Sequence, residues 1–528
     1  MPQSKLDSFV SSALKNVGIE EQIGYKIDVP PRREFGDFST NAAIIAGKKL
    51  SRNPLDVAEE IVAALQKIDN LKLIRELKTV KPGFINIFLN DAYIQQSVLE
   101  IHKQDHAWGK GDDYKGQKIL LEFVSANPTG PLHVGHGRWA VIGDIIGNLF
   151  KAVEYSVTKE FYVNNVGNQI EMLIKSIEAA KAGKPTPEGG YGGVYIRDIS
   201  DKLKEQSSKI KTSGEIIKDI INQQKHVLSN LGIEFDSWFL ESQLHEGNKI
   251  FAAVQILHDL GKTFEEGGAI WFKSQETGDD KNRVLIREDG RPTYFAADIA
   301  YHLDKYNRGF DQIINIWGTD HHGYVGRLKG AIGALGLPVE KFNIIIGQLV
   351  TLYRGDEPVR MSKRTGEMVT LQEVIDEIGC DATRFFFAAT DVNSHLDFDL
   401  ELAKKQSNDN PVFYVQYAHA RICSILKKSQ SLNPKSEQGD IISNLNDPAE
   451  RRLMLKLLAW PETVKLAAKL RHPHRICEYG KELATEFHHF YEKCRVLGNS
   501  ARLVLVDASR ITLRNVLELL GVTAPESM

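Results

Sequence analysis

The stretch EFVSANPTGPLHVGHGRWAVIGD, residues 122–144, decides how the middle of the chain folds. It continues a nearly unbroken apolar run, KILLEFV at 118–124, of the kind that a buried parallel strand shows. The chain then turns through Asn127–Pro131, and an amphipathic helix is expected over 135–153. A strand, a glycine- and proline-rich turn and a helix in this order predict an α/β unit with functional groups at the strand's carboxyl end.

Two further apolar runs, at 312–317 and 343–350, indicate more buried strands, with a helix expected over 325–335 between them. Strands that alternate with helices predict a doubly wound parallel, Rossmann-like sheet over residues 113–390. The stretch from about 180 to 291 interrupts this alternation with polar, Gly- and Pro-punctuated sequence. We interpret it as an insertion within the α/β domain.

The flanking parts of the chain have different patterns. Residues 1–112 mix helical and strand-like periodicities, which predicts a small α+β domain that ends at the glycine-rich junction 109–113. From about residue 385 onward strand-like patterns are no longer found. Four amphipathic stretches, at 411–427, 449–470, 476–497 and 509–520, predict an all-α helical bundle over 391–528.

Composition limits the class of protein. A chain of 528 residues is too long for one core, and 42% apolar with 26% charged residues is typical of globular proteins. No apolar run is long enough to span a bilayer, and we expect no secretory signal, because no apolar stretch follows the first charged residues. The four cysteines include no Cys-x-x-Cys pair, so we expect no disulfide framework, no zinc and a cytoplasmic location.

Charge is unevenly divided along the chain although the total is only −3. Residues 1–112 are balanced, residues 113–400 carry 40 acidic against 32 basic residues, and residues 401–528 carry 14 against 19. An acidic middle suits a cationic or metal-bound ligand, and a basic tail suits a phosphate backbone. An imbalance of this size is also common as surface scatter.

Two segments carry candidate chemistry. His133 and His136 share a face at a helix start, where backbone N–H groups attract phosphate, and Gly135 leaves room for a nucleotide. The alternatives are a metal pair or two hydrogen-bonded loop histidines. The second segment, RMSKRTG at 360–366, is a cationic loop whose Lys363 suits the β- and γ-phosphates, although basic loops are often merely solvated.

Together these two segments resemble the motifs of class I aminoacyl-tRNA synthetases, which read His-Ile-Gly-His and Lys-Met-Ser-Lys-Ser. Residues 122–136, YFAADIAY at 294–301 and NPVFYVQYAHAR at 410–421 narrow the resemblance to the arginine-specific family. REFGDFSTN at 33–41 is similar to the extra N-terminal domain of that family. The chain departs from the motifs at Val134, Arg360 and Arg364, which leaves the role of Arg360 open.

The resemblance implies roles for individual residues. Catalysis is implied for His133, His136 and Lys363, and ATP binding for these three with Gly135, Met361 and Ser362. Arginine binding is implied for two groups of residues. Asp298 and Tyr294 take the guanidinium, which requires carboxylates in bidentate geometry, and Ser125 and Asn127 with Glu122 hold the amino acid near its reacting carboxylate. Asp298 is alternatively a helix surface charge, and Tyr294 a core aromatic. His321, in the segment Asp320-His321-His322, is a further candidate for substrate or ribose, or alternatively a metal ligand or loop anchor. tRNA binding is implied for Tyr414, Tyr417 and Arg421, some of which are alternatively bundle core.

The implied function is an arginine–tRNA ligase with ATP, its Mg²⁺, L-arginine and the tRNA for arginine as partners, acting as a monomer without membrane association. The resemblance also implies that tRNA binds before arginine is activated, that residues 1–112 contact the tRNA corner and that the helical tail reads the anticodon. Rival hypotheses are a synthetase for another amino acid such as cysteine, a small-molecule nucleotidyltransferase, and a catalytically dead tRNA-binding paralogue. The cleft segments lack a Cys/His constellation, which argues against the cysteine enzyme. The long helical tail argues against a nucleotidyltransferase, and the presence of His133, His136 and Lys363 argues against a dead paralogue.

Overall fold

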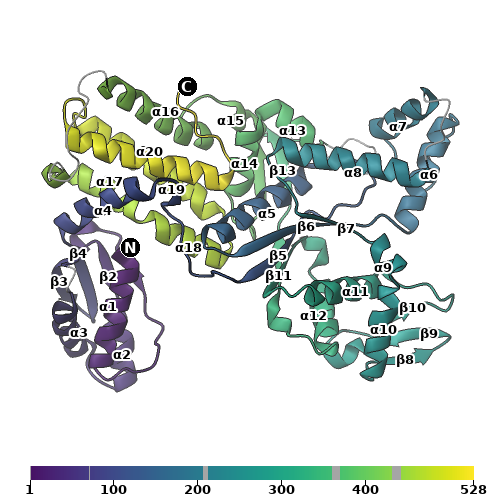
Figure 1. Ribbon diagram of the computed structural model, residues 1–528, viewed down its shortest axis with the longest axis horizontal. Helices are drawn as coiled ribbons and strands as arrows, with labels where there is room; N and C mark the ends of the chain where they lie inside the picture. Colours follow the sequence, from purple (N-terminus) through teal and green to yellow (C-terminus); the bar gives the residue numbers. More distant parts are fainter. Residues whose placement is uncertain (1, 70–71, 206–211, 360–368, 431–441) are drawn as a thin grey trace.

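The computed structural model describes residues 2–69, 72–205, 212–359, 369–430 and 442–528. The chain forms an N-terminal domain, a central α/β region and a C-terminal helical bundle, and the bundle lies between the N-terminal domain and part of the central region (Figure 1). In the described ranges, no helix combines the length and the apolar character needed to cross a bilayer.

The central region is built on a five-stranded sheet in which every neighbouring pair is parallel. Its order is β12 (Phe342–Gly347), β11 (Gln312–Gly318), β5 (Lys118–Glu122), β6 (Ser156–Val163) and β7 (Ser237–Leu240). The chain runs outward from β5 through β6 to β7 and then returns to place β11 on the other side of β5. The order therefore reverses between β5 and β11, which is where open α/β sheets bind ligands. The predicted doubly wound parallel sheet is confirmed.

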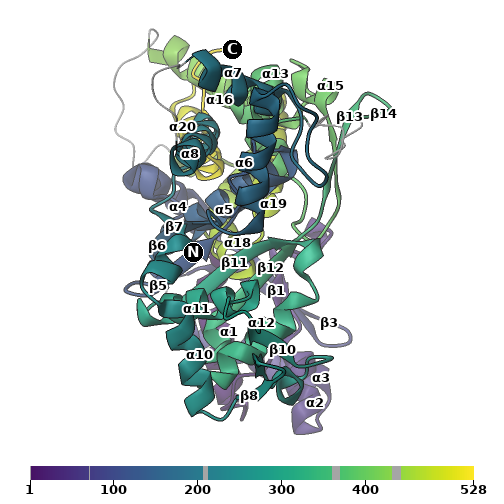
Figure 2. The same ribbon diagram turned by 90° about the vertical axis from the view of Figure 1, so that its right-hand side faces the viewer.

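Helix α5 (Val134–Ala152) connects β5 to β6 and is buried along most of its length. The helix lies close to the sheet because Gly143 has no side chain: a Cβ atom there would be 2.3 Å from the ring of Phe123. Helices α11 (Tyr294–Asn307) and α12 (Tyr324–Ala334) lie before and after β11, and pack against each other on the side of the small antiparallel sheet (Figure 2).

The segment expected to be one insertion is two, because β7 belongs to the main sheet. Between β6 and β7 stand the helices α6 (Asn168–Lys181), α7 (Val194–Glu205) and α8 (Ser213–Asn230). Between β7 and α11 stand α9 (Ser242–Glu246), α10 (Lys249–Asp259) and an antiparallel sheet of β8 (Thr263–Glu266), β9 (Ala269–Phe272) and β10 (Arg283–Ile286). Four residues at a sheet edge give too short an apolar pattern to stand out in the sequence.

The N-terminal domain has an antiparallel sheet in the order β1 (Ile27–Asp28), β2 (Phe38–Thr40), β4 (Phe84–Leu89) and β3 (Ile74–Val80). Its helices are α1 (Pro2–Asn16), α2 (Ala42–Leu50) and α3 (Pro54–Ile68), and α4 (Asp91–Gln104) leads toward the bundle. Arg451 of the bundle joins the two: it makes a bidentate ion pair with Asp37 at 2.5 and 2.8 Å and a third contact with Asp91 at 2.7 Å.

The bundle consists of α16 (Pro411–Gln430), α17 (Pro448–Leu458), α18 (Trp460–Leu470), α19 (His474–Lys493) and α20 (Ser500–Leu520). Before it come β13 (Val350–Arg354), β14 (Glu357–Pro358), α13 (Leu371–Ile378), α14 (Cys380–Ala388), β15 (Leu396–Asp399) and α15 (Leu400–Lys404). Strand β15 pairs in parallel with β13, so the expectation that strands end at about residue 385 was wrong.

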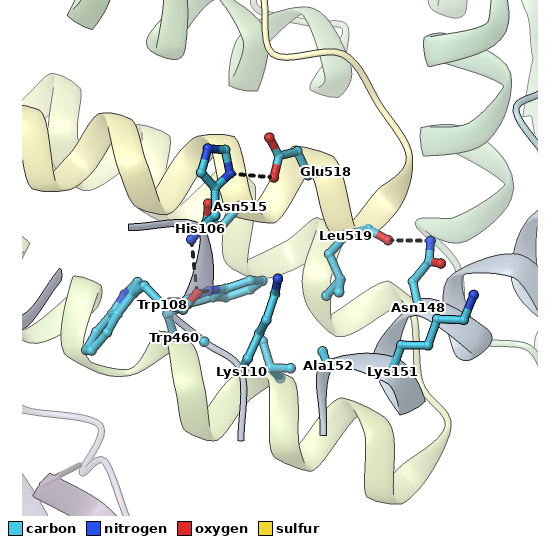
Figure 3. A pocket seen from close by; sticks show the side chains of 12 residues that line it. His106, Trp108, Lys110, Asn148, Lys151, Ala152, Trp460, Asn515, Glu518 and Leu519 are labelled. Carbon is cyan, nitrogen blue, oxygen red and sulfur yellow. Dashed lines mark hydrogen bonds and ion pairs between the residues drawn. The ribbon is translucent and has the colours of Figure 1, made fainter. Parts of the chain in front are cut away.

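The chain passes from the N-terminal domain to the central region beside two tryptophans (Figure 3). The backbone carbonyl of Trp108 accepts hydrogen bonds from Nε1 of Trp460 and from Nδ2 of Asn515, each at 3.0 Å. These residues border a cavity of about 270 Å³ that is also lined by Lys110 and Lys151. The linker is therefore held against α18 and α20 rather than extending freely.

A buried charge cluster joins α5, β6, α14 and the end of α20. Asp144 accepts from Lys159 and from Arg384, each at 2.5 Å, and Arg384 also donates to the carbonyl oxygen of Leu520 at 2.8 Å. Burial alone would raise the pKa of Asp144, but the two cations outweigh it and the pKa lies below its usual range. Asp144 thus stays ionised, and its contribution to stability is lost as the pH falls through this lowered pKa.

Replacing Asp144 by Asn should destabilise the protein by about 3–5 kcal/mol, because two cations would remain buried without a carboxylate. The midpoint of urea-induced unfolding measures the change. Lys159→Met is the matched control, since it leaves Asp144 paired with Arg384 and should cost clearly less. Equal losses in the two variants would contradict the role given to Asp144.

Candidate active site

The two motif histidines form the start of helix α5. His133 is the N-cap residue: the N–H of Gly135 donates to Nδ1 of His133 at 3.1 Å, and the N–H of His133 donates to Nδ1 of His136 at 3.3 Å. The two rings stack with their centroids 3.6 Å apart. Because each Nδ1 accepts a backbone N–H, the neutral rings carry their protons on Nε2. This helix start therefore presents imidazole donors fixed by the backbone.

Gly135 has a local role as well. A Cβ atom at this position would lie 3.1 Å from Cε1 of the His133 ring, so the absent side chain allows that ring to fold back over the helix. The same loop is joined to the chain before α13, where His133 pairs with Thr370 and the N–H of Leu371 donates to the carbonyl of Leu132 at 2.8 Å. The predicted residues Met361, Ser362 and Lys363, together with Arg360 and Arg364, lie outside the described residues.

Glu122 ends strand β5 and is 5% exposed. Its Oε1 accepts from the hydroxyl of Ser125 at 2.7 Å, and its Oε2 pairs with the fully buried ammonium of Lys305 on α11. Val124 and Ser125, which follow this strand, are two consecutive residues in the left-handed region, with φ of +68° and +42°. Non-glycine residues seldom adopt this conformation, and strain of this kind is concentrated at functional sites.

Asp298 lies one turn into α11, whose first turn is at the carboxyl-end edge of the sheet. Its Oδ2 accepts from the hydroxyl of Tyr324 at 2.5 Å. Glu241 follows the last residue of β7, is 4% exposed and accepts from the hydroxyl of Tyr162 at 2.8 Å. Two carboxylates from different elements are thus held by tyrosine hydroxyls, with Glu122 close enough to affect both Asp298 and Tyr162 electrostatically. We call Glu122, Glu241 and Asp298 the acidic pocket.

The surroundings of the acidic pocket raise the pKa values of two of its carboxyl groups. Burial raises the pKa of Asp298 to about 7, and repulsion from Glu122 and Glu241 acts in the same direction, while the Tyr324 hydrogen bond and Lys305 oppose it. Burial likewise raises the pKa of Glu241. A cation bound between Asp298 and Glu241 would relieve both the burial cost and the repulsion. The electrostatics therefore favour a cationic ligand.

The other predicted arginine-binding residues are less closely grouped. Asn127 donates to Oε1 of Gln169 at 2.6 Å. Tyr294 opens α11, is 51% exposed and has its hydroxyl near the position that a Cβ of Gly167 would take. His321 is exposed, with its ring 5.7 Å from that of Trp317. The side-chain hydrogen bonds that the structure shows to Glu122, Glu241 and Asp298 come instead from Ser125, Lys305, Tyr162 and Tyr324.

Sequence reasoning missed Glu241, Tyr324 and Lys305. Glu241 follows the short apolar run SWFL at 237–240, so recognising that run as a parallel strand would have marked the acid that ends it. Lys305 is one turn beyond Tyr301 on the helix that carries Asp298, and its ammonium also lies 4.3 Å from the centre of the Tyr301 ring. Nothing in the local sequence distinguishes this buried lysine from a solvated one.

The three residues predicted to bind tRNA lie together on α16, against α19. The rings of Tyr414 and Tyr417 are centred 5.3 and 6.0 Å from that of His488, and the Arg421 guanidinium lies 4.7 Å from the centre of the Tyr491 ring. All three predicted residues are partly exposed. We call this group the bundle aromatic face, and His488 and Tyr491 are members that the sequence did not indicate.

The N-terminal domain carries a second aromatic surface. A groove of about 390 Å³ is lined by exposed apolar side chains, including Phe35 and Phe84, which are 38% and 41% exposed. Polar groups stand beside them, among them Ser39, whose hydroxyl donates to Oδ1 of Asn86 at 2.8 Å. We call it the N-terminal groove.

Comparison with known proteins agrees with this arrangement. Family models match residues 4–89 (arginyl tRNA synthetase N terminal domain), 97–189 and 194–393 (tRNA synthetases class I (R), catalytic domain), and 415–528 (DALR anticodon binding domain). The parallel sheet, the helix start with its two histidines and these matches define a class I aminoacyl-tRNA synthetase.

Relatives that match nearly the whole chain identify the particular family within this class. Arginine–tRNA ligases of Heliobacterium modesticaldum and Moorella thermoacetica are each 43% identical, over 97% and 98% of this chain and 96% of theirs. The arginyl-tRNA synthetase structure of Thermus thermophilus superposes with a TM-score of 0.80 at 22% identity and full coverage of both chains, which shows the shared fold. The chain belongs to the arginyl-tRNA synthetase family.

Replacing Tyr324 by Phe should raise the pKa of Asp298 above about 7, because the hydroxyl that stabilises the ionised carboxylate is removed. Infrared difference spectroscopy across a pH titration measures the carboxylate band, and Asp298→Asn assigns it. Tyr306→Phe is a control tyrosine, since its hydroxyl donates to the carbonyl of Pro338 instead. An unchanged or lowered midpoint in Tyr324→Phe would contradict the proposed environment of Asp298.

Proposed function

We propose that this chain is an arginine–tRNA ligase, which activates L-arginine with ATP to arginyl-adenylate and pyrophosphate and then transfers arginine to the 3′ end of its tRNA. Family membership over nearly the whole chain supports this activity. The single structural observation that carries the proposal is the acidic pocket at the edge of the sheet that also holds the His133–His136 helix start.

The reaction requires positioning and charge stabilisation rather than a protein nucleophile. The carboxylate of arginine attacks the α-phosphorus of ATP in line, and pyrophosphate leaves. His133 and His136 donate from Nε2 to phosphate oxygens whose charge grows during the attack. The helix start adds backbone N–H groups and the positive end of the helix dipole. We assign catalysis to these two histidines and to Lys363, and ATP binding also to Gly135, Met361 and Ser362.

The acidic pocket selects the amino acid. The guanidinium is planar, always charged and has five donors, so it can pair with Asp298 and Glu241 at once, with Tyr294 beside it. Glu122 is already paired with Lys305, and we therefore give it a positioning role: it holds Ser125, whose loop leads to Asn127. Lysine would be disfavoured, because a single ammonium leaves part of a buried carboxylate pair unsatisfied.

The accompanying ions and the state of the protein are also proposals. Mg²⁺ would enter with ATP through the phosphate oxygens, and no step of the reaction calls for zinc. We propose a cytoplasmic monomer whose site is complete within one chain. His321 stands near the end of β11, where it would contact ribose or the amino acid.

The tRNA would contact both aromatic surfaces. The bundle aromatic face combines stacked rings with the cation of Arg421, which suits unstacked bases and their backbone. The N-terminal groove offers Phe35 and Phe84 for a base and Asn86 for its edge. The two surfaces belong to the two parts of the chain that the Arg451 ion pairs join, so one tRNA that contacts both would span this junction.

The function is tested by ATP–pyrophosphate exchange with each amino acid, run with and without tRNA. Arginine should support exchange and lysine should not, because only the guanidinium satisfies both carboxylates. We also expect exchange to require the tRNA for arginine. Exchange with lysine or cysteine but not arginine would refute the proposed specificity, whereas equal exchange without tRNA would remove only the requirement for tRNA.

His136→Ala should slow exchange by about 10²–10³-fold, the usual loss when one transition-state donor is removed. His136→Gln should recover part of the rate, since its amide can donate to the same oxygen. His226, exposed on α8, is the control, and His226→Ala should leave the rate unchanged. A His136→Ala enzyme with the full rate and unchanged melting temperature would exclude His136 from catalysis.

A further inference from the structure

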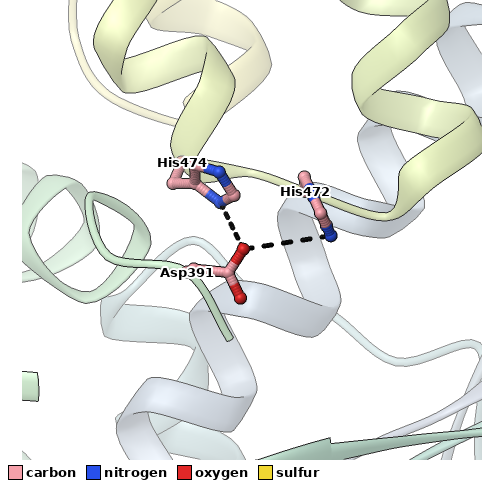
Figure 4. Close-up of side chains that lie close together, drawn as sticks. All are labelled: Asp391, His472 and His474. Atoms are coloured by element: carbon pink, nitrogen blue, oxygen red, sulfur yellow. Dashed lines mark ion pairs between the residues drawn. The ribbon is translucent and has the colours of Figure 1, made fainter. Parts of the chain in front are cut away.

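Three side chains with metal-ligating atoms converge away from the acidic pocket. Asp391 precedes β15, and His472 and His474 stand at the start of α19, so the group joins the central region to the bundle (Figure 4). In the parts of the chain that the structure describes, this is the one group of three His, Cys, Asp or Glu side chains with such proximity.

The distances between the three groups are too long for hydrogen bonds. Oδ2 of Asp391 is 3.6 Å from Nδ1 of His474 and 3.9 Å from Nε2 of His472, and all three ligand atoms lie within 4.8 Å of one another. Within the described residues, Nδ1 of His474 is buried with no hydrogen-bond partner. A buried imidazole nitrogen without a hydrogen-bond partner requires an explanation, and a cation bound beside the Asp391 carboxylate would supply one.

Two of the three ligand–ligand distances are close to those of a transition-metal site. Ligands at 2.0–2.2 Å in tetrahedral zinc geometry are about 3.4 Å apart, so both carboxylate–imidazole distances need to shorten by only a few tenths of an ångström. The side chain of His472 is 26% exposed, so little packing opposes a small shift of its imidazole toward Asp391. Two imidazoles and one carboxylate suit Zn²⁺ or a similar ion rather than Mg²⁺ or Ca²⁺, and a water would take the fourth position.

Neighbouring groups hold the aspartate in place. Oδ1 of Asp391 accepts from the backbone N–H and the side-chain amide of Asn393 at 2.8 and 3.0 Å, which leaves Oδ2 to face the histidines. The carbonyl oxygen of Asp391 accepts from the buried guanidinium of Arg138 at 3.0 Å. Arg138 is on α5, two residues after His136. A carboxylate fixed in this way resembles a metal ligand oriented by outer hydrogen bonds.

We propose that Asp391, His472 and His474 bind one Zn²⁺ or similar divalent transition-metal ion, which ties the start of α19 to the loop that Arg138 holds. The ion is structural: it joins the bundle to the central region and takes no part in arginine activation. This proposal differs from the expectation, drawn from the cysteines alone, that the chain holds no zinc. It does not depend on the proposed function.

The test uses the full chain, stripped with a chelator and titrated with ZnCl₂ by calorimetry and by thermal unfolding. We expect one strong equivalent and a melting temperature that rises with the zinc concentration. His472→Ala and Asp391→Asn should each weaken binding by at least about 10-fold and remove the thermal shift. Co²⁺ in place of zinc should give visible absorption bands of a tetrahedral site in the unsubstituted protein and not in these variants.

The control is the exposed pair of His395 and Asp397, whose atoms are 3.4 Å apart without a second histidine. His395→Ala should keep the zinc equivalent and the thermal shift. Because Asp391→Asn could destabilise the loop itself, His472→Ala decides the test if Asp391→Asn fails to fold, since His472 is the more exposed of the two histidines. No zinc binding, or binding that survives His472→Ala unchanged, would overturn the proposal.

Discussion

The mutual repulsion of buried carboxylates at the carboxyl-end edge of the sheet is the constraint on which the account of this site depends. Glu122, Glu241 and Asp298 come from β5, the end of β7 and α11. Glu122 is paired with the ammonium of Lys305, and Oε1 of Glu241 lies 3.7 Å from Nε2 of His245. Burial, together with repulsion from Glu122 and Glu241, raises the pKa of Asp298 to about 7. A permanently charged guanidinium removes this repulsion and leaves both carboxylates ionised, which is a physical reason for a site of this kind to favour arginine.

The same sheet edge places the reactive end of the substrate. β5 carries Glu122 at its last residue and leads, eleven residues later, into the helix start at His133. The reversal of strand order between β5 and β11 opens this edge, so a cationic side chain and a triphosphate can be bound on either side of one strand end. Farther away, charged contacts fix the domains: Arg451 joins the N-terminal domain to the bundle, and Arg384 joins the central region to α20.

The sequence predicted the parts of the fold that have long or strongly apolar patterns. The strands at 118–122, 312–318 and 342–347 and the helix 134–152 are where periodicity indicated them. β7 and β15 were missed because each has only four residues, and the single helix expected over 449–470 is two, α17 and α18, with Pro461 at the start of the second. Such short elements are defined by their tertiary partners, not by local propensity.

The candidate site divides in a similar way. The histidines, Glu122, Ser125 and Asp298 stand in stretches that resemble a known family, so their positions could be expected. Glu241 and Tyr324 could not, because each becomes a pocket residue only through the pairing of β7 and the packing of α12. Lys305 could not be predicted at all, since nothing in the sequence indicates that this lysine is buried and paired with Glu122.

Proton release on arginine binding tests the central claim most directly. Calorimetry at pH 7 in buffers of different ionisation enthalpy, with tRNA bound, measures the protons exchanged. If the guanidinium pairs with an Asp298 whose pKa is about 7 in the free protein, about half a proton should leave Asp298 per arginine, and clearly less should leave in Asp298→Asn, where only the raised pKa of Glu241 contributes. Proton uptake, or the same release from Asp298→Asn, would show that arginine is not recognised by the acidic pocket.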